Sequence, residues 1–363
     1  MSKQKFFQLP DFWKAFFSGL IKPSGVSVTI ALLMVVATLL TLCVFVNSTL
    51  FSQAQRSYWM RGSYDHYVEL SANVQCLNRL DKTTPVIAII GASSTHESFI
   101  SPQEMETAFY KKTGKKVQVR DLTASAMWNW EMAAVADKLP EGIHGVVVLP
   151  VGLSRFSTEA KNDQAGLVTH PRLGFTSDAF DNEVQIAGHK VPWRSGIYFL
   201  DNLQFFCVRF PYLEQNILQG RPEYKRGFYS TFKKVDSLEW KTVIIPYVET
   251  RKNFYDENVR DGLATYSRVI DALNKKGAVT IVLLQDPMNP RYIHEILGDS
   301  LYQRYQSRME SFADSKGVTF LDLNNVVPLI DEDFSDHTHL RVYDTQRKYS
   351  QMFLDTISKL SHF

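Results

Sequence analysis

Three side chains that together could perform nucleophilic catalysis stand at two separate places in this sequence. Ser93 follows the apolar run 86–90, and Asp336 and His339 stand three positions apart near the C-terminus. A serine hydroxyl becomes a good nucleophile when a histidine takes its proton, and a carboxylate fixes the tautomer of that histidine and stabilises its cation. The three residues predict an enzyme with Ser93 as nucleophile, His339 as base and Asp336 as the carboxylate that orients the base.

Each of these residues also has a structural interpretation. A serine after a strand is often the N-cap of a helix, and an acidic run such as 331–333 is usually solvated surface. His337 is a competing base, but only His339 has the spacing that lets one loop or helical turn supply both aspartate and histidine. The three residues together, in this order along the chain, favour catalysis.

Alternating strand and helix patterns must bring these residues together. Short apolar runs rich in β-branched residues predict buried strands, and periodic segments with helix start and stop residues predict helices. The expected strands are 86–90, 116–121, 145–150, 278–284 and 318–323, and the expected helices are 102–112, 127–139, 258–276, 301–316 and 341–360. This alternation predicts an α/β domain of three layers around a mostly parallel sheet.

In such sheets, ligands gather at the carboxyl ends of the strands. Ser93 follows the first expected strand, and Gly152 and Ser154 follow the third. Asp336 and His339 follow the fifth. We therefore expect all of these residues at one edge of the sheet.

The first fifty residues have a different pattern. No charged side chain occurs between Pro23 and Gln53, and residues 26–46 are mostly apolar, which is about the twenty residues that a helix needs to cross a bilayer. The apolar region of a signal peptide is shorter, so an uncleaved anchor is favoured, although residues 52–54 loosely resemble a cleavage site. Lysines outnumber acidic residues before the span, which predicts a cytoplasmic N-terminus and a domain on the outer side.

The chain divides into parts of different character. The expected parts are a cytoplasmic or interfacial segment 1–24, a transmembrane anchor 25–48, a stalk 49–84, and an α/β domain 85–363 with an insertion at 155–256. The insertion has scattered aromatic, glycine and proline residues and is too long for a simple connection. We expect it near the active-site edge, with a helix at 197–218 that Pro211 interrupts.

Several kinds of site are not indicated by the sequence. A formal net charge of +2, with no dense Lys/Arg tract outside the ends, gives no support for nucleic-acid binding. The histidines do not cluster at the spacing of metal ligands and no glycine-rich nucleotide loop is present, so we expect neither a metal nor a cofactor. Cys76 and Cys207 would lie in an oxidising compartment and could pair, although two cysteines so far apart are weak evidence for a disulfide.

In its two motifs the sequence resembles the SGNH hydrolase family, also called GDSL-like. Gly91-Ala92-Ser93 stands where that family has Gly-Asp-Ser after the first strand, and residues 336–339 match its Asp-x-x-His block before a closing helix. The resemblance covers roughly residues 85–155 and 258–363. It implies a flavodoxin-like three-layer α/β fold and the same three catalytic residues.

The family's other site residues are matched in part. Ser125 stands near the place of the family's glycine block, and Ser154 stands where its asparagine would be, two residues after Gly152. The Ser154 hydroxyl and the backbone N–H of Ser93 could donate to a developing oxyanion, and losing one such donor can cost about a hundred- to a thousandfold in rate. Arg155 could assist them or bind an anionic substrate.

The anchor and the serine motif together resemble one branch of this family. Its members are envelope proteins that assist alginate O-acetylation and teichoic-acid D-alanylation beside a membrane-bound O-acyltransferase. The resemblance implies a periplasmic domain, anchored in the bacterial inner membrane, that passes an acyl group to a cell-envelope polysaccharide through an acyl-serine, with acetyl the first candidate. Two alternatives stay open: an anchored carbohydrate or lipid esterase, and an inactive SGNH-like scaffold of an envelope assembly complex.

Overall fold

A parallel β-sheet forms the centre of the domain. The computed structural model of the chain describes residues 24–54, 56–62, 65–223, 234, 236–253, 255–324, 326–341 and 344–360. The strands in this part of the chain are β1 Val86–Gly91, β2 Gln118–Thr123, β3 His144–Val151, β4 Ala278–Gln285 and β5 Thr319–Leu321. Their order is β2-β1-β3-β4-β5, and every neighbouring pair is parallel. The predicted α/β class and parallel sheet are confirmed.

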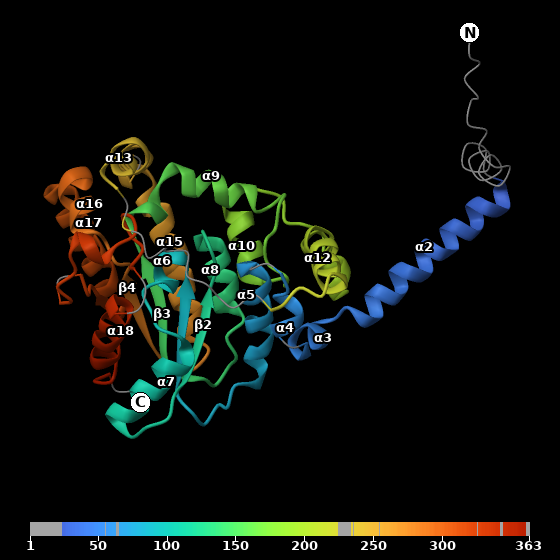
Figure 1. Ribbon diagram of the computed structural model, residues 1–363, viewed down its shortest axis with the longest axis horizontal. Helices are drawn as coiled ribbons and strands as arrows, with labels where there is room; N and C mark the ends of the chain where they lie inside the picture. The colour runs from blue at the N-terminus through green and yellow to red at the C-terminus, as the bar shows by residue number, and fades with distance from the viewer. Residues whose placement is uncertain are drawn as a thin grey trace, which may run out of the picture.

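Helices connect the strands and extend the chain before and after them (Figure 1). The α-helices of the described residues are α2 Gly25–Phe45, α3 Ser48–Gln53, α4 Arg56–Trp59, α5 His66–Gln75, α6 Ser93–His96, α7 Pro102–Thr113, α8 Asn129–Asp137, α9 Thr158–Gly166, α10 Asp178–Ile186, α11 Tyr198–Asp201, α12 Leu203–Leu218, α13 Ser237–Glu239, α14 Ile245–Lys252, α15 Tyr255–Asn274, α16 Pro290–Tyr292, α17 Asp299–Lys316 and α18 Asp344–Ile357. Short 3₁₀ and π turns join several of them. The predicted segment 1–24 lies outside the described residues, apart from Ser24.

Alternate residues of β1 enter two different hydrophobic clusters. Val86, Ala88 and Ile90 belong to the larger cluster, which also contains side chains of α5, α8 and α15. Ile87 and Ile89 belong to a second cluster, to which α7 and α18 contribute. Because neighbouring residues of a strand point to opposite faces, the sheet is buried on both faces, as parallel sheets usually are.

Local sequence signals explain where several helices begin and end. α7 begins with a capping box: Ser101 Oγ accepts from the backbone N–H of Glu104, and the Glu104 carboxylate accepts from the N–H of Ser101. It ends at Gly114, whose φ of 72° is left-handed. α17 ends in the same way at Gly317, with a φ of 63°. α7 was predicted from the residues at its start, and α17 from the glycine at its end.

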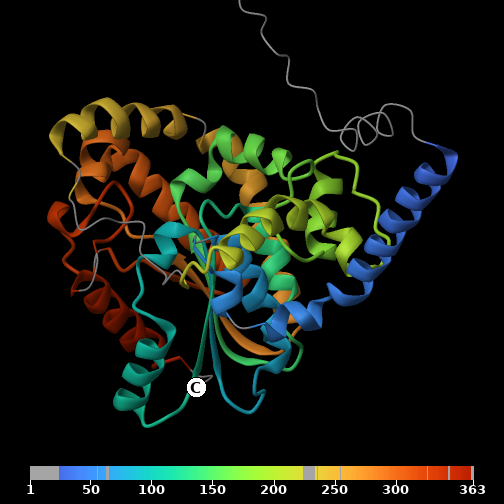
Figure 2. The same ribbon diagram turned by 45° about the vertical axis from the view of Figure 1, so that its right-hand side comes forward.

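α2 is the helix that the sequence predicts to cross a membrane. It is long and apolar enough to do so, and its side chains are exposed along most of its length. Its last turn docks on the domain, because Leu42 and Cys43 pack against the larger cluster and Val46 directly after the helix is buried. Figure 2 shows α2 as a long helix at the side of the domain. This candidate span therefore joins the domain without a free linker.

Residues 49–84 do not stand apart as a stalk, which corrects the prediction. α5 packs beside β2, and Tyr67 and Leu70 are buried in the larger cluster. Phe51 of α3 is 2% exposed, and its ring centroid lies 6.0 Å from that of Phe205. The segment is part of the domain, held by residues far away in the sequence.

The predicted insertion shares the core of the domain. Residues 155–256 supply helices α9 to α14, and Phe205 and Trp240 are buried in the larger cluster. The helix expected at 197–218 is present as α11 and α12, and Pro211 lies inside α12. The insertion is therefore packed onto the sheet-bearing part of the chain.

The disulfide that the sequence left open is not formed. Cys76 and Cys207 are both free thiols. Cys207 lies on the exposed side of α12, whereas the thiol of Cys76 points to the backbone carbonyl of Ser52. The two side chains therefore belong to different environments.

Candidate active site

The three predicted catalytic side chains lie in one hydrogen-bonded chain. Ser93 Oγ lies 3.0 Å from His339 Nε2, and His339 Nδ1 lies 2.6 Å from Asp336 Oδ2. Asp336 Oδ1 accepts from the backbone N–H groups of Thr338 and His339, at 2.8 Å each. The imidazole thus lies between a hydroxyl that could lose a proton and a carboxylate that could stabilise the imidazolium.

The end of β1 and the loop after β5 position the nucleophile and the base. Ser93 is the first residue of α6, the single helical turn that follows β1. His339 lies in the loop before α18. The bridge between Phe334 and Leu340 closes this loop, and the N–H of Ser335 donates to the His339 carbonyl. Two segments distant in sequence therefore meet at the carboxyl edge of the sheet, as ligand sites of such sheets usually do.

A buried carboxylate holds the turn that carries the nucleophile. Ser94 Oγ and Thr95 Oγ1 donate to the two carboxylate oxygens of Asp286, at 3.0 and 2.8 Å. Gly91 leaves room for this packing, because a Cβ there would lie 2.5 Å from Thr95 Oγ1. Asp286 is not among the predicted site residues. The available signal was its position, because it stands two residues after the fourth expected strand, at the edge where ligands gather.

Neighbouring charges set the pKa values of the triad. Burial opposes the ionisation of Asp336, but the charge and hydrogen bond of His339 hold the pKa of Asp336 below its ordinary value. Burial likewise lowers the pKa of His339, but the charge and hydrogen bond of Asp336, with the charges of Glu97 and Asp286, raise it to about 9. The surroundings of the base favour the imidazolium, which is the form created when the serine gives up its proton.

Gly152 and Ser154 lie at the end of β3. Gly152 is buried, and a Cβ there would lie 3.5 Å from Asp286 Oδ2, so its backbone adjoins the turn that carries Ser93. Ser154 is partly buried in the 3₁₀ turn that follows. Among the hydrogen bonds of the described residues, none joins the Ser154 hydroxyl to the triad.

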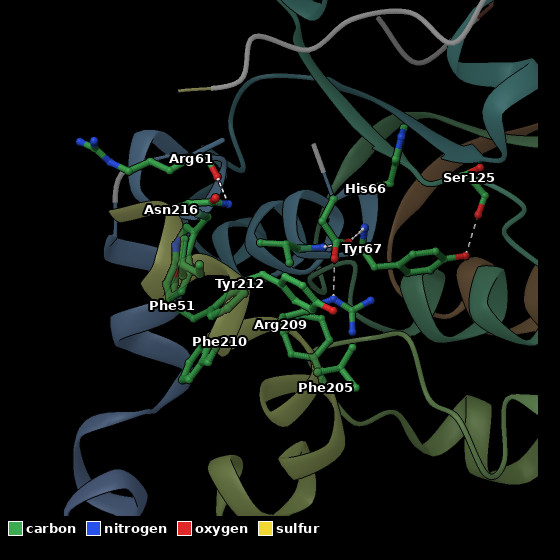
Figure 3. A pocket seen from close by; sticks show the side chains of 15 residues that line it. Phe51, Arg61, His66, Tyr67, Ser125, Phe205, Arg209, Phe210, Tyr212 and Asn216 are labelled. Carbon is green, nitrogen blue, oxygen red and sulfur yellow. Dashed lines mark hydrogen bonds and ion pairs between the residues drawn. The ribbon is translucent and has the colours of Figure 1, made fainter. Parts of the chain in front are cut away.

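Ser125 lies just beyond the end of β2, the strand beside β1. The backbone N–H of Ala124 donates to the Gly91 carbonyl at 3.0 Å, so the turn with Ser125 adjoins the end of the strand that precedes Ser93. The Ser125 carbonyl accepts from the Tyr67 hydroxyl at 2.9 Å, and Ser125 lines a cavity beside α5 and α12 (Figure 3). Among the hydrogen bonds of the described residues, none joins Ser125 to the triad, and its role at the site stays a prediction.

Arg155 is enclosed beneath the site. It is 5% exposed, and its Nη1 donates to the backbone carbonyl of Met127 at 3.0 Å. Burial raises the pKa of Asp286, and the charge of Arg155 opposes that rise. The charge of Arg155 therefore acts on the buried carboxylate. Arg155 also lines a cavity beside α9, α10 and α15, and a role toward an anionic substrate stays a prediction.

His337, the competing base, has a different environment from His339. Its ring packs edge-on against Tyr292, with centroids 5.2 Å apart, and its backbone carbonyl accepts from the N–H of Asn289. Its Nδ1 lies 3.8 Å from Asp336 Oδ1. The histidine in contact with Ser93 is His339.

The described residues contain no group of three or more His, Cys, Asp or Glu side chains arranged to hold a metal ion. No model of a known protein family and no curated protein matches the chain. The geometry of the site is therefore the basis of the function proposed for it.

Proposed function

We propose that the protein is a membrane-anchored O-acyltransferase, which carries an acyl group on Ser93 and passes it to a hydroxyl of a cell-envelope polysaccharide. One observation carries this proposal: Ser93, His339 and Asp336 form a continuous hydrogen-bonded chain at the carboxyl edge of a parallel sheet. Such a chain supplies the nucleophile, the base and the orienting carboxylate that acyl transfer needs.

The reaction has two steps through one acyl-serine. Ser93 Oγ attacks the carbonyl carbon of the donor while its proton passes to His339 Nε2, and the leaving group departs with that proton. The acceptor hydroxyl then attacks the acyl-serine, gives its proton to Nε2, and takes the acyl group as the proton returns to Ser93 Oγ. The negative oxygen formed in each step needs donors. The backbone N–H of Ser93, at the start of α6, has no partner within that helix and could be one of them.

The proposal includes a flavodoxin-like, three-layer SGNH fold for the domain. The strand order β2-β1-β3-β4-β5 is the order of flavodoxin-like doubly wound sheets. The two hydrophobic clusters on opposite faces of the sheet agree with helical layers on both sides. Together with the serine and Asp-x-x-His motifs, these features support membership of that family.

The proposal places the domain in the periplasm of a bacterium. α2 is the candidate span, and the lysines at positions 3, 5, 14 and 22 precede it, with Asp11 as the acidic residue among them. Positively charged flanks stay on the cytoplasmic side, so the domain that follows α2 would lie across the inner membrane. A membrane-bound O-acyltransferase would then supply the acyl group from the cytoplasmic pool.

The test uses the full chain in detergent or nanodiscs with p-nitrophenyl acetate as donor. We expect the wild type to release p-nitrophenol and to carry one acetyl group on the peptide that contains Ser93, as measured by mass spectrometry. The Ser93→Ala variant should form no adduct, and its rate of p-nitrophenol release should be lower by at least about a thousandfold. Ser311→Ala, an exposed serine of α17, should match the wild type.

The outcomes separate the candidate functions. Transfer of the acetyl group to added oligosaccharide supports the acyltransferase. Hydrolysis that depends on Ser93 but gives no transfer indicates an esterase, and neither activity nor adduct indicates a scaffold. Equal rates for Ser93→Ala and the wild type would show that Ser93 is not the nucleophile.

A further inference from the structure

α12 carries apolar side chains on both its inner and its outer side. Its sixteen residues contain two charged side chains, Arg209 and Glu214. On the inner side, Phe205 and Phe206 are each 1% exposed. The exposed residues of the outer side are mostly uncharged, with Glu214 as the exception: Gln204, Cys207, Val208, Pro211, Tyr212, Glu214, Gln215 and Leu218. Exposed Val208, Tyr212 and Leu218 on one side of a helix mark a surface that could contact an apolar partner or a membrane.

α12 lies beside the point where α2 joins the domain. α11, which directly precedes α12, contacts α2, and Figure 1 shows α12 near the domain end of α2. Phe51, a few residues after α2, packs edge-on against Phe205 and Phe206. Any bilayer that α2 crosses therefore has its surface close to α12.

A cavity of about 360 Å³ opens between α4, α5 and α12 (Figure 3). Val208 and Tyr212 belong both to its lining and to the outer side of α12. Its other apolar lining residues are Phe51, Trp59, Val68, Phe205, Phe210 and Leu213. Arg209 crosses it, with Nε 2.9 Å from Asp65 Oδ2 and its guanidinium 4.4 Å from the centre of the Phe205 ring. The cavity gives this side of the domain depth and holds the ion pair of Arg209 with Asp65.

We propose that the outer side of α12 and this cavity form a lipid-contacting face, which rests on the bilayer that α2 crosses and holds a phospholipid there. Tyr212 and the strongly exposed Trp193, which lies shortly before α11, are of the types that prefer the interface between lipid and water. The apolar and aromatic side chains of the outer face can enter the headgroup layer, where water and lipid headgroups can solvate Glu214. The face involves none of the triad residues, so it stands independently of the acyl-transfer proposal.

The native Cys207 on this face permits a direct test. The full chain with Cys43→Ser and Cys76→Ser is labelled at Cys207 with a nitroxide and placed in nanodiscs of phosphatidylethanolamine and phosphatidylglycerol. Collision rates are measured by electron paramagnetic resonance with oxygen, which concentrates in lipid, and with a water-soluble nickel chelate. The control carries Cys207→Ser as well and is labelled at Ser311→Cys, on the exposed side of α17.

We expect the oxygen-to-chelate ratio at Cys207 to exceed that of the control several-fold. A ratio equal to that of the control overturns the proposal, because it would show that this face is in water away from the bilayer. A second measurement tests the cavity, because brominated phosphatidylglycerol quenches a tryptophan that it touches. Trp59→Phe should reduce the quenched fraction of the fluorescence and Trp240→Phe, at a fully buried site elsewhere, should not. A fraction unchanged by Trp59→Phe would exclude a lipid in the cavity.

Discussion

At the scale of single residues, the base of the proposed triad lies among more negative charge than one aspartate provides. Asp336 contacts His339 directly, while Glu97 and Asp286 act on it from further away. Asp286 also binds the two residues after the nucleophile. It is therefore placed to influence both the position of the serine and the proton affinity of the histidine. We assign it a positioning role.

Asp286→Asn should move the pH dependence of the reaction. His339 accepts a proton only when it is neutral, so the rate of acyl-serine formation should rise with pH as the imidazole loses its proton. Asp286 helps to raise the pKa of His339, so Asp286→Asn should shift this rise to lower pH. The same change should destabilise the fold by about 1–3 kcal/mol, because an amide offers one acceptor to two hydroxyl donors. The rate of p-nitrophenol release is measured by stopped flow across a range of pH for the wild type and the variant. The same pH–rate profile for both would show that Asp286 does not influence the proton affinity of His339.

The His339–Asp336 pair should also make stability depend on pH. The pKa of His339 is raised from 6.5 to about 9 in the folded protein. Its contribution to the free energy of unfolding is therefore fully present below about pH 6.5 and is lost as the pH rises through about 9. The pKa of Asp336 is lowered in the folded protein, so its contribution to the free energy of unfolding is present above the unfolded pKa of about 3.9 and is lost as the pH falls through the folded pKa. Asp336→Asn removes both contributions. Its cost in the free energy of unfolding should be at least about 1 kcal/mol larger at pH 6 than at pH 9.5, as measured with urea. A cost that does not change with pH would show that the pair is uncharged.

At the scale of elements, β1 and β3 approach each other with no space for a side chain at Gly145. Its φ is +118°, and a Cβ there would lie 2.3 Å from the carbonyl oxygen and 2.7 Å from the nitrogen of Val86. Backbone atoms cannot move aside without breaking the ladder between the strands. This glycine therefore sets the spacing at the centre of the sheet.

Gly145→Ala should destabilise the domain by about 3 kcal/mol or more, because it adds both a backbone clash and an unfavourable φ. Gly166→Ala is the matched control, because Gly166 lies in α9 with nothing within 4 Å of an added Cβ. That control should be neutral or stabilising by up to about 1 kcal/mol. The melting temperatures of the two variants are measured by thermal unfolding, and we expect that of Gly145→Ala to be clearly lower. Similar melting temperatures would show that β1 and β3 can accommodate a side chain at position 145.

The elements could be predicted from the sequence where the signal is local. Buried β-branched runs and capping residues located all five strands and helices such as α7 and α17. β2 was placed about two residues early, because Asp121 resembles the polar end of a strand. In the structure its carboxylate accepts from Thr123 and contacts His96. The contact with His96 of α6 comes from another element, so no local pattern shows it.

The site shows the same division between local and distant information. The i, i+3 spacing of Asp336 and His339 is local, and it suggested the pair before their contact with Ser93 was known. Asp286 could not be distinguished from a solvated acidic residue after a strand, because its burial depends on hydroxyl groups nearly two hundred positions earlier. For Arg155 the sequence left two roles open, assisting the oxyanion donors or binding an anionic substrate. Its burial, with 5% of its surface exposed, is a property of the packed domain that no local pattern shows.

At the scale of the whole molecule, the segment between the span and β1 is a structural part of the domain. α5 supplies Tyr67, Val68, Leu70 and Val74 to the larger cluster. Removing one such buried side chain costs about 2–5 kcal/mol. Removing several of them would cost more than the total stability of a typical domain, which is about 5–15 kcal/mol. The boundary that the sequence suggested at residue 85 therefore cuts through the core.

A chain that begins at residue 85 should fail to fold, whereas one that begins at residue 47 should fold without the span. The second retains Phe51 and α5, and so keeps their contacts with α12 and β2. Near-ultraviolet circular dichroism and a cooperative melting transition would distinguish the two. Equal melting temperatures would show that residues 49–84 are dispensable.

In the proposed function, the docked last turn of α2 would also determine which substrates Ser93 can reach. A domain on a flexible tether samples a sphere whose radius grows with the length of the tether. Here Leu42, Cys43 and Val46 pack on the domain itself, so a protein anchored by α2 would hold Ser93 at one constant height above the bilayer. Its search would be two-dimensional, by lateral diffusion. Polymer strands would be modified only where they pass through that thin layer, close to the place where they leave the membrane.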